Sequence, residues 1–229
     1  MTWMQVEKYL TSDDRCVLPL GSTEQHAYIS LATDSILAER VATEAAEPLG
    51  VPVFPVVAYG ITPYFMGFPG TVTLSPATYE RVLTEVLTSL RRHGFRRILV
   101  VNGHGGNSPA RPAAEAWADR RAGVQLRWHD WWKAPEVRAV IDAIDPDASH
   151  ASWMETYPWT RVTGVAPPAG HKNPVDLPDR DAVSPERFRA AAGDGSFGGD
   201  YVRSDAEMKR LWETAVRETR GRLMEGWDA

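Results

Sequence analysis

Histidines and carboxylates follow the apolar runs of this 229-residue chain, at the places where a parallel sheet would present them together. Glu24 and His26 come after a run that ends at Leu20, and His104 comes after a run that ends at Val101. Glu24 and His26 are two residues apart, so their side chains leave the same face of an extended segment. Ligands of open parallel sheets bind beyond the carboxyl ends of the strands. This placement predicts a metal site there.

Three further side chains extend this group. Asp34 lies at the predicted start of a helix, where a negative charge is favoured. His150 and Glu155 would be about 140° apart on one continuous helix, so they meet only if His150 precedes a helix that contains Glu155. An aspartate between separate histidine and glutamate ligands suits two metals about 3.5–4 Å apart. Nitrogen and oxygen donors without a thiolate suit Zn, Mn, Fe or Co, and the candidate ligands are Glu24, His26, Asp34, His104 and Glu155.

Each of these residues also has a plainer interpretation. Asp34 could be a helix cap, Glu24 and His26 could form a hydrogen-bonded turn, and His150 could lie in a cap region without a ligand. His104 stands among three glycines, which could clear space for a ligand or form a phosphate-binding loop. The phosphate loop is the weaker alternative, because the third glycine of the dinucleotide fingerprint and the P-loop motif are both absent.

The elements that must position these residues alternate between strands and helices. Short apolar runs predict strands at 15–20, 52–57, 97–101 and 124–128. Helical spacing and capping residues predict helices at 34–49, 75–94, from 108, and after the capping box at 204–207. A long loop with a short helix at 185–192 is predicted over 167–199. The alternation predicts an α/β fold with a mostly parallel sheet, helices on both faces, and a single α/β/α domain over residues 1–229.

Composition and charge narrow the function classes. Apolar residues make up 43% and charged residues 24%, near the average of globular proteins, which excludes a disordered chain. The net charge of -5 argues against a nucleic-acid partner. The single cysteine, Cys16, indicates a reducing compartment, and we expect a cytoplasmic protein. No signal-peptide pattern and no apolar run of about 18 residues occur, so no membrane partner is expected.

Four motifs resemble those of the creatininase (creatinine amidohydrolase) family and occur in the family's order. The first is LPLGSTEQH at 18–26, which is followed by TD at 33–34. The others are GFPGTVTL at 67–74, NGHGGN at 102–107 and HAxxxET at 150–156. The resemblance implies a parallel sheet covered by helices, two divalent metal ions (Zn, Mn or Fe) and a toroidal homohexamer. It implies a bridging role for Asp34 and an acid/base role for His150. The metal ligands that it implies are Glu24, His26, Asp34, His104 and Glu155. The catalytic residues that it implies are His150 and Glu155.

We therefore expect a dinuclear metal-dependent amidohydrolase that cleaves a C–N amide bond of a small substrate, cyclic amides included, with a metal-bridged hydroxide. One alternative within the family is a formamidopyrimidine-type deformylase or a peptide-clipping enzyme. An alternative from another class is a non-catalytic ligand-binding subunit on the same scaffold. Retention of all five candidate ligands argues against that subunit.

The chain departs from creatininase beside the predicted site. The segment between His26 and Asp34 is one residue shorter and lacks the usual second histidine, with Tyr28 as the nearest polar group. Gly106 stands where creatininase has a glutamate. Both changes predict that creatinine is a poor substrate.

Aromatic side chains are candidates for the pocket wall, because flat substrates stack on them. Each of them could instead belong to the core. The candidates for substrate contact are Tyr28, Tyr64, Trp131 or Trp132, and Trp153.

Overall fold

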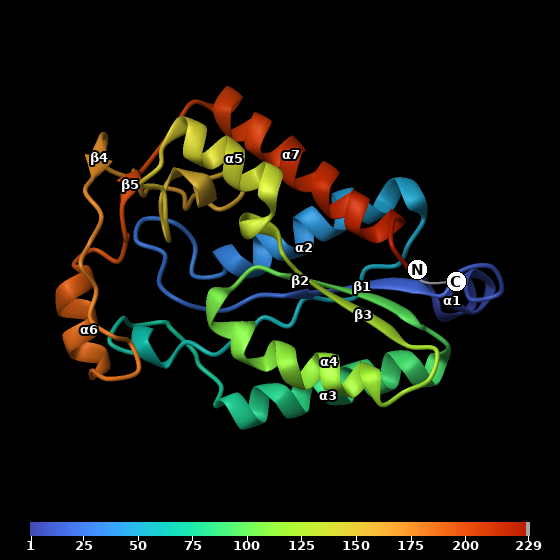
Figure 1. Cartoon of the computed structure of the whole chain (residues 1–229). Helices are drawn as coiled ribbons and strands as arrows, with labels where there is room; N and C mark the ends of the chain where they lie inside the picture. The colour runs from blue at the N-terminus through green and yellow to red at the C-terminus, as the bar shows by residue number, and fades with distance from the viewer. Residues whose placement is uncertain (228–229) are drawn as a thin grey trace.

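A parallel sheet forms the centre of the computed structural model, which describes residues 1–227 (Figure 1). Its three strands are adjacent in the order of the sequence: β1 (Arg15–Leu20), β2 (Arg97–Asn102) and β3 (Gln125–Asp130). The last residues of all three strands are paired across the sheet. The carboxyl ends of the strands therefore share one edge, where the predicted site must lie.

Helices cover both faces of this sheet (Figure 1). One face carries α2 (Thr33–Ala46), α5 (Pro135–Ile144) and α7 (Asp205–Met224). The other face carries α3 (Pro76–His93) and α4 (Arg111–Asp119). This arrangement confirms the predicted α/β fold with helices on both faces of a mostly parallel sheet.

Alternating side chains of β1 and β2 build the two cores. Val17 and Leu99 belong to the apolar cluster under α2, α5 and α7. Leu18 and Val100 belong to the cluster under α3 and α4. Successive side chains of a strand leave opposite faces, so a continuous apolar run supplies both layers. The sheet is thereby held as a rigid platform for the loops at its edge.

The smaller elements lie toward the two ends of the sheet. The helix α1 (Trp3–Tyr9) lies at the end opposite to α6 (Pro185–Ala192) (Figure 1). Near α6 lies an antiparallel pair of two-residue strands, β4 (His171–Lys172) and β5 (Gly199–Asp200). Single turns of 3₁₀-helix occur at η1 (Glu47–Leu49), η2 (Pro63–Phe65), η4 (Trp131–Lys133) and η5 (Trp153–Glu155), with a longer one at η3 (Gly105–Ala110).

Capping residues explain where the predicted helices begin and end. The Ser75 side chain accepts a hydrogen bond from the Thr78 N–H, and Pro76 is the first residue of α3. Gly94 ends α3 with a φ of 114°, a left-handed conformation that suits glycine. Ser204 and Glu207 form the predicted capping box of α7.

The prediction of a strand at 52–57 is wrong. This segment runs beside β1 but pairs with it only through isolated bridges, from Val17 to Val53 and from Leu20 to Val57. Pro55 has no N–H to donate, and Pro19 of β1 has none either, so the ladder is interrupted.

Two predicted helices also have different bounds. The helix predicted over 34–49 ends at Ala46, and η1, which contains Pro48, follows it. The helix predicted from 108 begins at Arg111, after the 3₁₀-helix η3. No helix within residues 1–227 is long and apolar enough to cross a membrane.

Candidate metal centre

The predicted ligands converge beyond the carboxyl ends of β1 and β2. Glu24 and His26 lie in the loop after β1, and Asp34 is the second residue of α2. His104 follows β2, and Glu155 is the last residue of η5. All five side chains are buried, with no residue more than 8% exposed. Segments far apart in the sequence thus deliver five possible ligands to one place.

Asp34 lies at the centre of the cluster. Its Oδ1 is 3.1 Å from His26 Nε2, and its Oδ2 is 3.1 Å from His104 Nδ1. Glu155 Oε2 is 3.9 Å from His26 Nε2, and Glu24 Oε2 is 3.2 Å from His104 Nδ1. Two groups of three possible ligands therefore share Asp34: one adds Glu24 and His104, and the other adds His26 and Glu155. Within each group the ligand atoms lie within 4.8 Å of one another.

Backbone carbonyls orient the two histidines of this cluster. His26 Nδ1 lies 3.2 Å from the Glu24 carbonyl oxygen, and His104 Nε2 lies 3.1 Å from that of Ile61. A carbonyl oxygen only accepts, so each of these nitrogens carries the hydrogen and donates it. The opposite nitrogen of each neutral ring then presents a lone pair to the carboxylates. Facing lone pairs repel unless a proton or a metal ion lies between them, and this orientation is the one found in metal-ligating histidines.

The ionisation of the cluster follows from burial and from the carboxylates. Burial lowers the pKa of His26, but Asp34, Glu155 and Glu24 outweigh it and raise that pKa to about 10. Burial likewise opposes the charged form of His104, yet Glu24 and Asp34 raise the pKa of its imidazole well above the usual value. Burial raises the pKa of the Glu155 carboxyl to about 7. A proton and a metal ion compete for the same lone pairs, so metal binding at this site releases protons.

The donor chemistry fits divalent cations. Asp34 Oδ2 is buried and has no hydrogen-bond partner among residues 1–227, although His104 Nδ1 lies 3.1 Å away. Such an orphaned oxygen is costly unless a cation satisfies it. The cluster offers nitrogen and oxygen atoms and no thiolate, which suits Zn or Mn.

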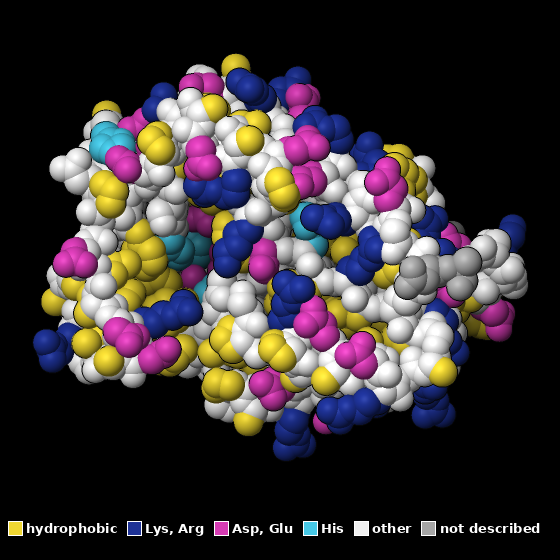
Figure 2. Space-filling model, in the orientation of Figure 1, with side chains coloured by type: hydrophobic (Ala, Val, Ile, Leu, Met, Phe, Trp, Pro, Cys, Tyr) yellow, Lys and Arg dark blue, Asp and Glu magenta, His cyan; other side chains and the backbone are white. Residues whose placement is uncertain are grey.

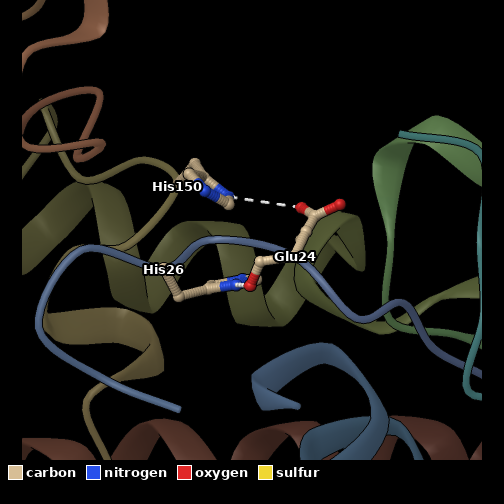
Figure 3. A group of neighbouring side chains, drawn as sticks. All are labelled: Glu24, His26 and His150. Atoms are coloured by element: carbon tan, nitrogen blue, oxygen red, sulfur yellow. Dashed lines mark hydrogen bonds and ion pairs between the residues drawn. The ribbon is translucent and has the colours of Figure 1, made fainter. Parts of the chain in front are cut away.

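His150 lies beside the same cluster, with its ring centroid 4.3 Å from that of His26. Its Nδ1 lies 4.0 Å from Glu24 Oε1, and Figure 3 shows the imidazole directed toward that carboxylate. The ring packs on Phe65 and Phe197, with centroids 4.9 Å and 4.8 Å away. Burial, and then the charge of His26, hold the pKa of His150 well below its usual value. As the spacing of His150 and Glu155 requires, His150 precedes the short helix that contains Glu155.

Gln25 holds the outer nitrogen of this imidazole. His150 Nε2 lies 3.1 Å from the Gln25 carbonyl oxygen and 2.9 Å from Gln25 Nε2. The Gln25 amide is itself fixed, since its Nε2 donates to the Gly195 carbonyl and its Oε1 accepts from the Ala27 N–H. His150 Nε2 thus has one acceptor and one donor in reach, so the neutral ring can carry its proton on either nitrogen.

A pocket of about 450 Å³ opens beside these ligands, and its wall includes Tyr64 and Trp132. Trp131 and Trp153, by contrast, are 1% and 0% exposed and pack in the core. Neither of these tryptophans lines the pocket, and their contact with substrate stays a prediction. Trp131 turns inward onto Trp212, whereas its neighbour Trp132 turns toward the pocket.

Tyr28 also lies outside the pocket wall. Its ring packs edge-on against Tyr201, with centroids 5.7 Å apart. Tyr28 thus lies near the residue that follows β5, and its contact with substrate stays a prediction.

Some pocket residues have no local sequence signal. They come from η2, η4, α5 and the long loop, and no motif or spacing in the sequence predicts a role for them: Phe65, Lys133, Arg138, Arg180 and Phe197. A cationic side chain in a proline-rich loop, such as Arg180, is usually exposed to solvent, so its sequence context does not indicate a binding site. His129 turns away from the site instead, and its Nε2 lies 3.0 Å from Thr219 Oγ1 in the core.

The fold and the site together define an α/β protein with a cluster of possible metal ligands at the carboxyl edge of its sheet. The sequence profile of the creatininase family, described as creatinine amidohydrolase, matches residues 1–222. The chain belongs to the creatininase family, as the four motifs predicted.

Named relatives differ in their activities. The chain is 43% identical to the mycofactocin precursor peptide peptidase of Mycolicibacterium smegmatis over 61% of its own length, and it spans about half (54%) of that relative. It is 34% identical to the creatinine amidohydrolase of Pseudomonas putida, over 68% of this chain and 67% of that protein. It is also 34% identical, over 46% of this chain and 34% of the relative, to the 3-dehydro-scyllo-inosose hydrolase of Thermotoga maritima.

Solved structures share the fold. A crystal structure of creatinine amidohydrolase (creatininase) superimposes with a TM-score of 0.81 at 24% identity, covering 99% of this chain and 97% of the other. A Mn form of creatininase gives the same TM-score at 23% identity, over 97% of this chain and 95% of the other.

Proposed function

We propose that this chain is a metal-dependent amidohydrolase that cleaves a C–N amide bond of a small substrate in the pocket beside Asp34. The observation that carries the proposal is the shared position of Asp34, which belongs to both groups of possible ligands. A carboxylate between two histidine and glutamate ligand sets is the arrangement that a two-metal hydrolase needs.

Five side chains would hold the two ions. Glu24 and His104 would bind one ion, His26 and Glu155 the other, and Asp34 both. Zn and Mn are the favoured metals, given the donor set and the Mn form of the related creatininase. Bound there, the ions would lower the pKa of a water molecule and polarise the amide carbonyl.

His150 would move the proton. Its pKa is held low by burial, so the ring is neutral and can accept a proton at Nδ1, the nitrogen that faces Glu24. This proton would come from the attacking water molecule, and it would then go to the leaving nitrogen of the amide, so that the amine departs as the C–N bond breaks. The rings of Phe65 and Phe197 hold the imidazole in place and keep water from its faces.

A peptide bond is the second candidate substrate. The supporting observation is the 43% identity to a mycofactocin precursor peptide peptidase. Both candidates use the same ligands and the same proton transfer, and they differ only in what the pocket must accommodate beyond the amide.

The test is amide hydrolysis by chelator-stripped protein and by protein reloaded with Zn or Mn. The panel contains creatinine, simple lactams, formamides and short peptides. We expect turnover of at least one class in reloaded protein, and its loss in stripped protein and in Glu24→Gln. Turnover that survives metal removal, or failure of the reloaded protein to retain metal, would contradict the proposal.

A further inference from the structure

Cationic side chains surround the opening of the proposed active-site pocket. Lys133 of η4, Arg138 of α5 and Arg180 of the long loop all line it, although the chain as a whole carries a net charge of -5. Figure 2 shows the histidine and acidic side chains inside a hollow with Lys and Arg side chains at its edge. Three separate segments thus place positive charge at one opening.

Two of these cations have no carboxylate partner among residues 1–227. Arg138 pairs with Asp142 on the same helix, so its charge is already matched. Lys133 Nζ lies 5.5 Å from the ring centroid of Trp132, and the Arg180 guanidinium lies 5.2 Å from that of Tyr64. Both rings line the pocket, so each cation is held over its wall.

The carboxylates of the metal centre do not account for these cations. Glu24, Asp34 and Glu155, together with the hydroxide that the reaction needs, would carry about four negative charges, as many as the positive charges of the two divalent ions of the proposed function. A metal centre of about zero net charge offers nothing to balance Lys133 and Arg180, so these two side chains give the pocket a positive potential. A positively lined cleft attracts and holds anions.

We propose that the substrate of this pocket is an amide that also carries an anionic oxygen group, a carboxylate or a phosphate, which Lys133 and Arg180 bind. This inference rests on the proposed function and names the substrate class for the same site. Arg180 presents several N–H donors to such a group, and Lys133 presents a compact charge. Trp132 and Tyr64 flank the body of the substrate between the anionic group and the amide.

Matched hydroxamates test the inference by direct binding rather than by turnover. Acetohydroxamate is neutral beyond its metal-binding group, succinic monohydroxamate adds a carboxylate, and phosphonoacetohydroxamate adds a phosphonate. Dissociation constants are measured by titration calorimetry on protein loaded with Zn or Mn, at low salt and in about 0.5 M NaCl. The last condition screens exposed charges, because the Debye length falls to a few ångströms near 1 M salt.

We expect at least one anionic hydroxamate to bind on the order of tenfold tighter than acetohydroxamate at low salt, as for charge-assisted hydrogen bonds. The better of the two identifies a carboxylate or a phosphate as the natural group. The advantage should shrink in high salt and largely disappear in the double variant Lys133→Met, Arg180→Met. The matched pair Lys209→Met, Arg187→Met removes two exposed cations elsewhere and should keep the advantage.

The outcomes separate this inference from the proposed function. Equal affinity for all three compounds, or an advantage that survives in the Lys133 and Arg180 double variant, would overturn the inference and leave the metal site intact. Failure of all three compounds to bind metal-loaded protein would contradict the proposed function and this inference together.

Discussion

Asp34 turns one carboxylate oxygen toward His26 and the other toward His104, each at 3.1 Å. Glu24 also shares a group of possible ligands with each histidine, one with Asp34 and His104 and one with His26 and His150, whereas Asp34 offers a separate oxygen to each of the two rings. The helix α2 fixes this position, because Asp34 lies in its first turn, where a negative charge is stabilised by the helix dipole. The relationship makes Asp34 the most informative residue to change.

We predict that Asp34→Asn lowers the metal content of the purified protein from about two ions per chain to less than one. The amide keeps the size of the side chain but loses the charge that would hold both ions. Metal is measured by mass spectrometry, and Asp205→Asn, in the first turn of α7 at the surface, is the matched control. Unchanged metal content in Asp34→Asn would contradict the bridging role.

His150→Asn should separate proton transfer from metal binding. We predict that turnover of any amide substrate falls on the order of 10²- to 10⁴-fold, the usual contribution of a positioned acid or base. Metal content should stay largely the same, because Glu24 and His26, which form a group of possible ligands with His150, each also belong to a group that contains Asp34. If turnover is unchanged, or if metal is lost in parallel, then His150 does not have the proposed role.

Creatinine should be a poor substrate. A Cβ atom at Gly106 would lie 2.1 Å from the Ile61 carbonyl oxygen and 2.3 Å from His104 Nε2, so no side chain fits there without displacing the metal centre. We predict a kcat/KM for creatinine below about 10⁴ M⁻¹s⁻¹, the lower end of the usual range. Steady-state assays on metal-loaded protein measure it, and a value above that range would show that this pocket accepts creatinine well.

The stability of the fold should depend on pH through His129. Burial, and then the charge of Arg222, lower the pKa of His129 to about 4. A base with a depressed folded pKa stabilises the fold fully above its unfolded pKa of about 6.5, and that stability is lost as the pH falls toward 4. The predicted loss is about 3 kcal/mol between these two values, from about 1.4 kcal/mol per pKa unit.

Urea unfolding in the presence of a chelator measures this effect without a contribution from metal release. His129→Gln keeps a polar side chain near Thr219 but removes the titrating group. Its free energy of unfolding should fall less than that of the unaltered protein between pH 7.5 and 4.5. Equal losses in both proteins would show that His129 does not control acid stability.

The convergence of the ligands could be predicted from the sequence because strand ends fix their place. Glu24, His26 and His104 each follow a strand, and parallel strands end at one edge of a sheet. By contrast, Trp131 and Trp132 are neighbours in one short turn, and no periodicity says which of them faces the core.

Long-range contacts set the remaining features. Arg180 reaches the pocket only because the loop between β4 and α6 folds over the end of the sheet, and its local sequence contains no sign of that path. The distance along the chain from His26 predicts Tyr28 beside the site, whereas the backbone turns at Ala27, with a φ of 48°, and the Tyr28 ring packs against Tyr201.

Anomalous X-ray diffraction from crystals grown with Mn²⁺ tests the two-metal centre most directly. We predict two anomalous peaks about 3.5–4 Å apart, one between Glu24 and His104 and the other between His26 and Glu155, with Asp34 bridging them. A single peak, peaks elsewhere on the protein, or no peak at these five side chains would contradict the proposed two-metal centre.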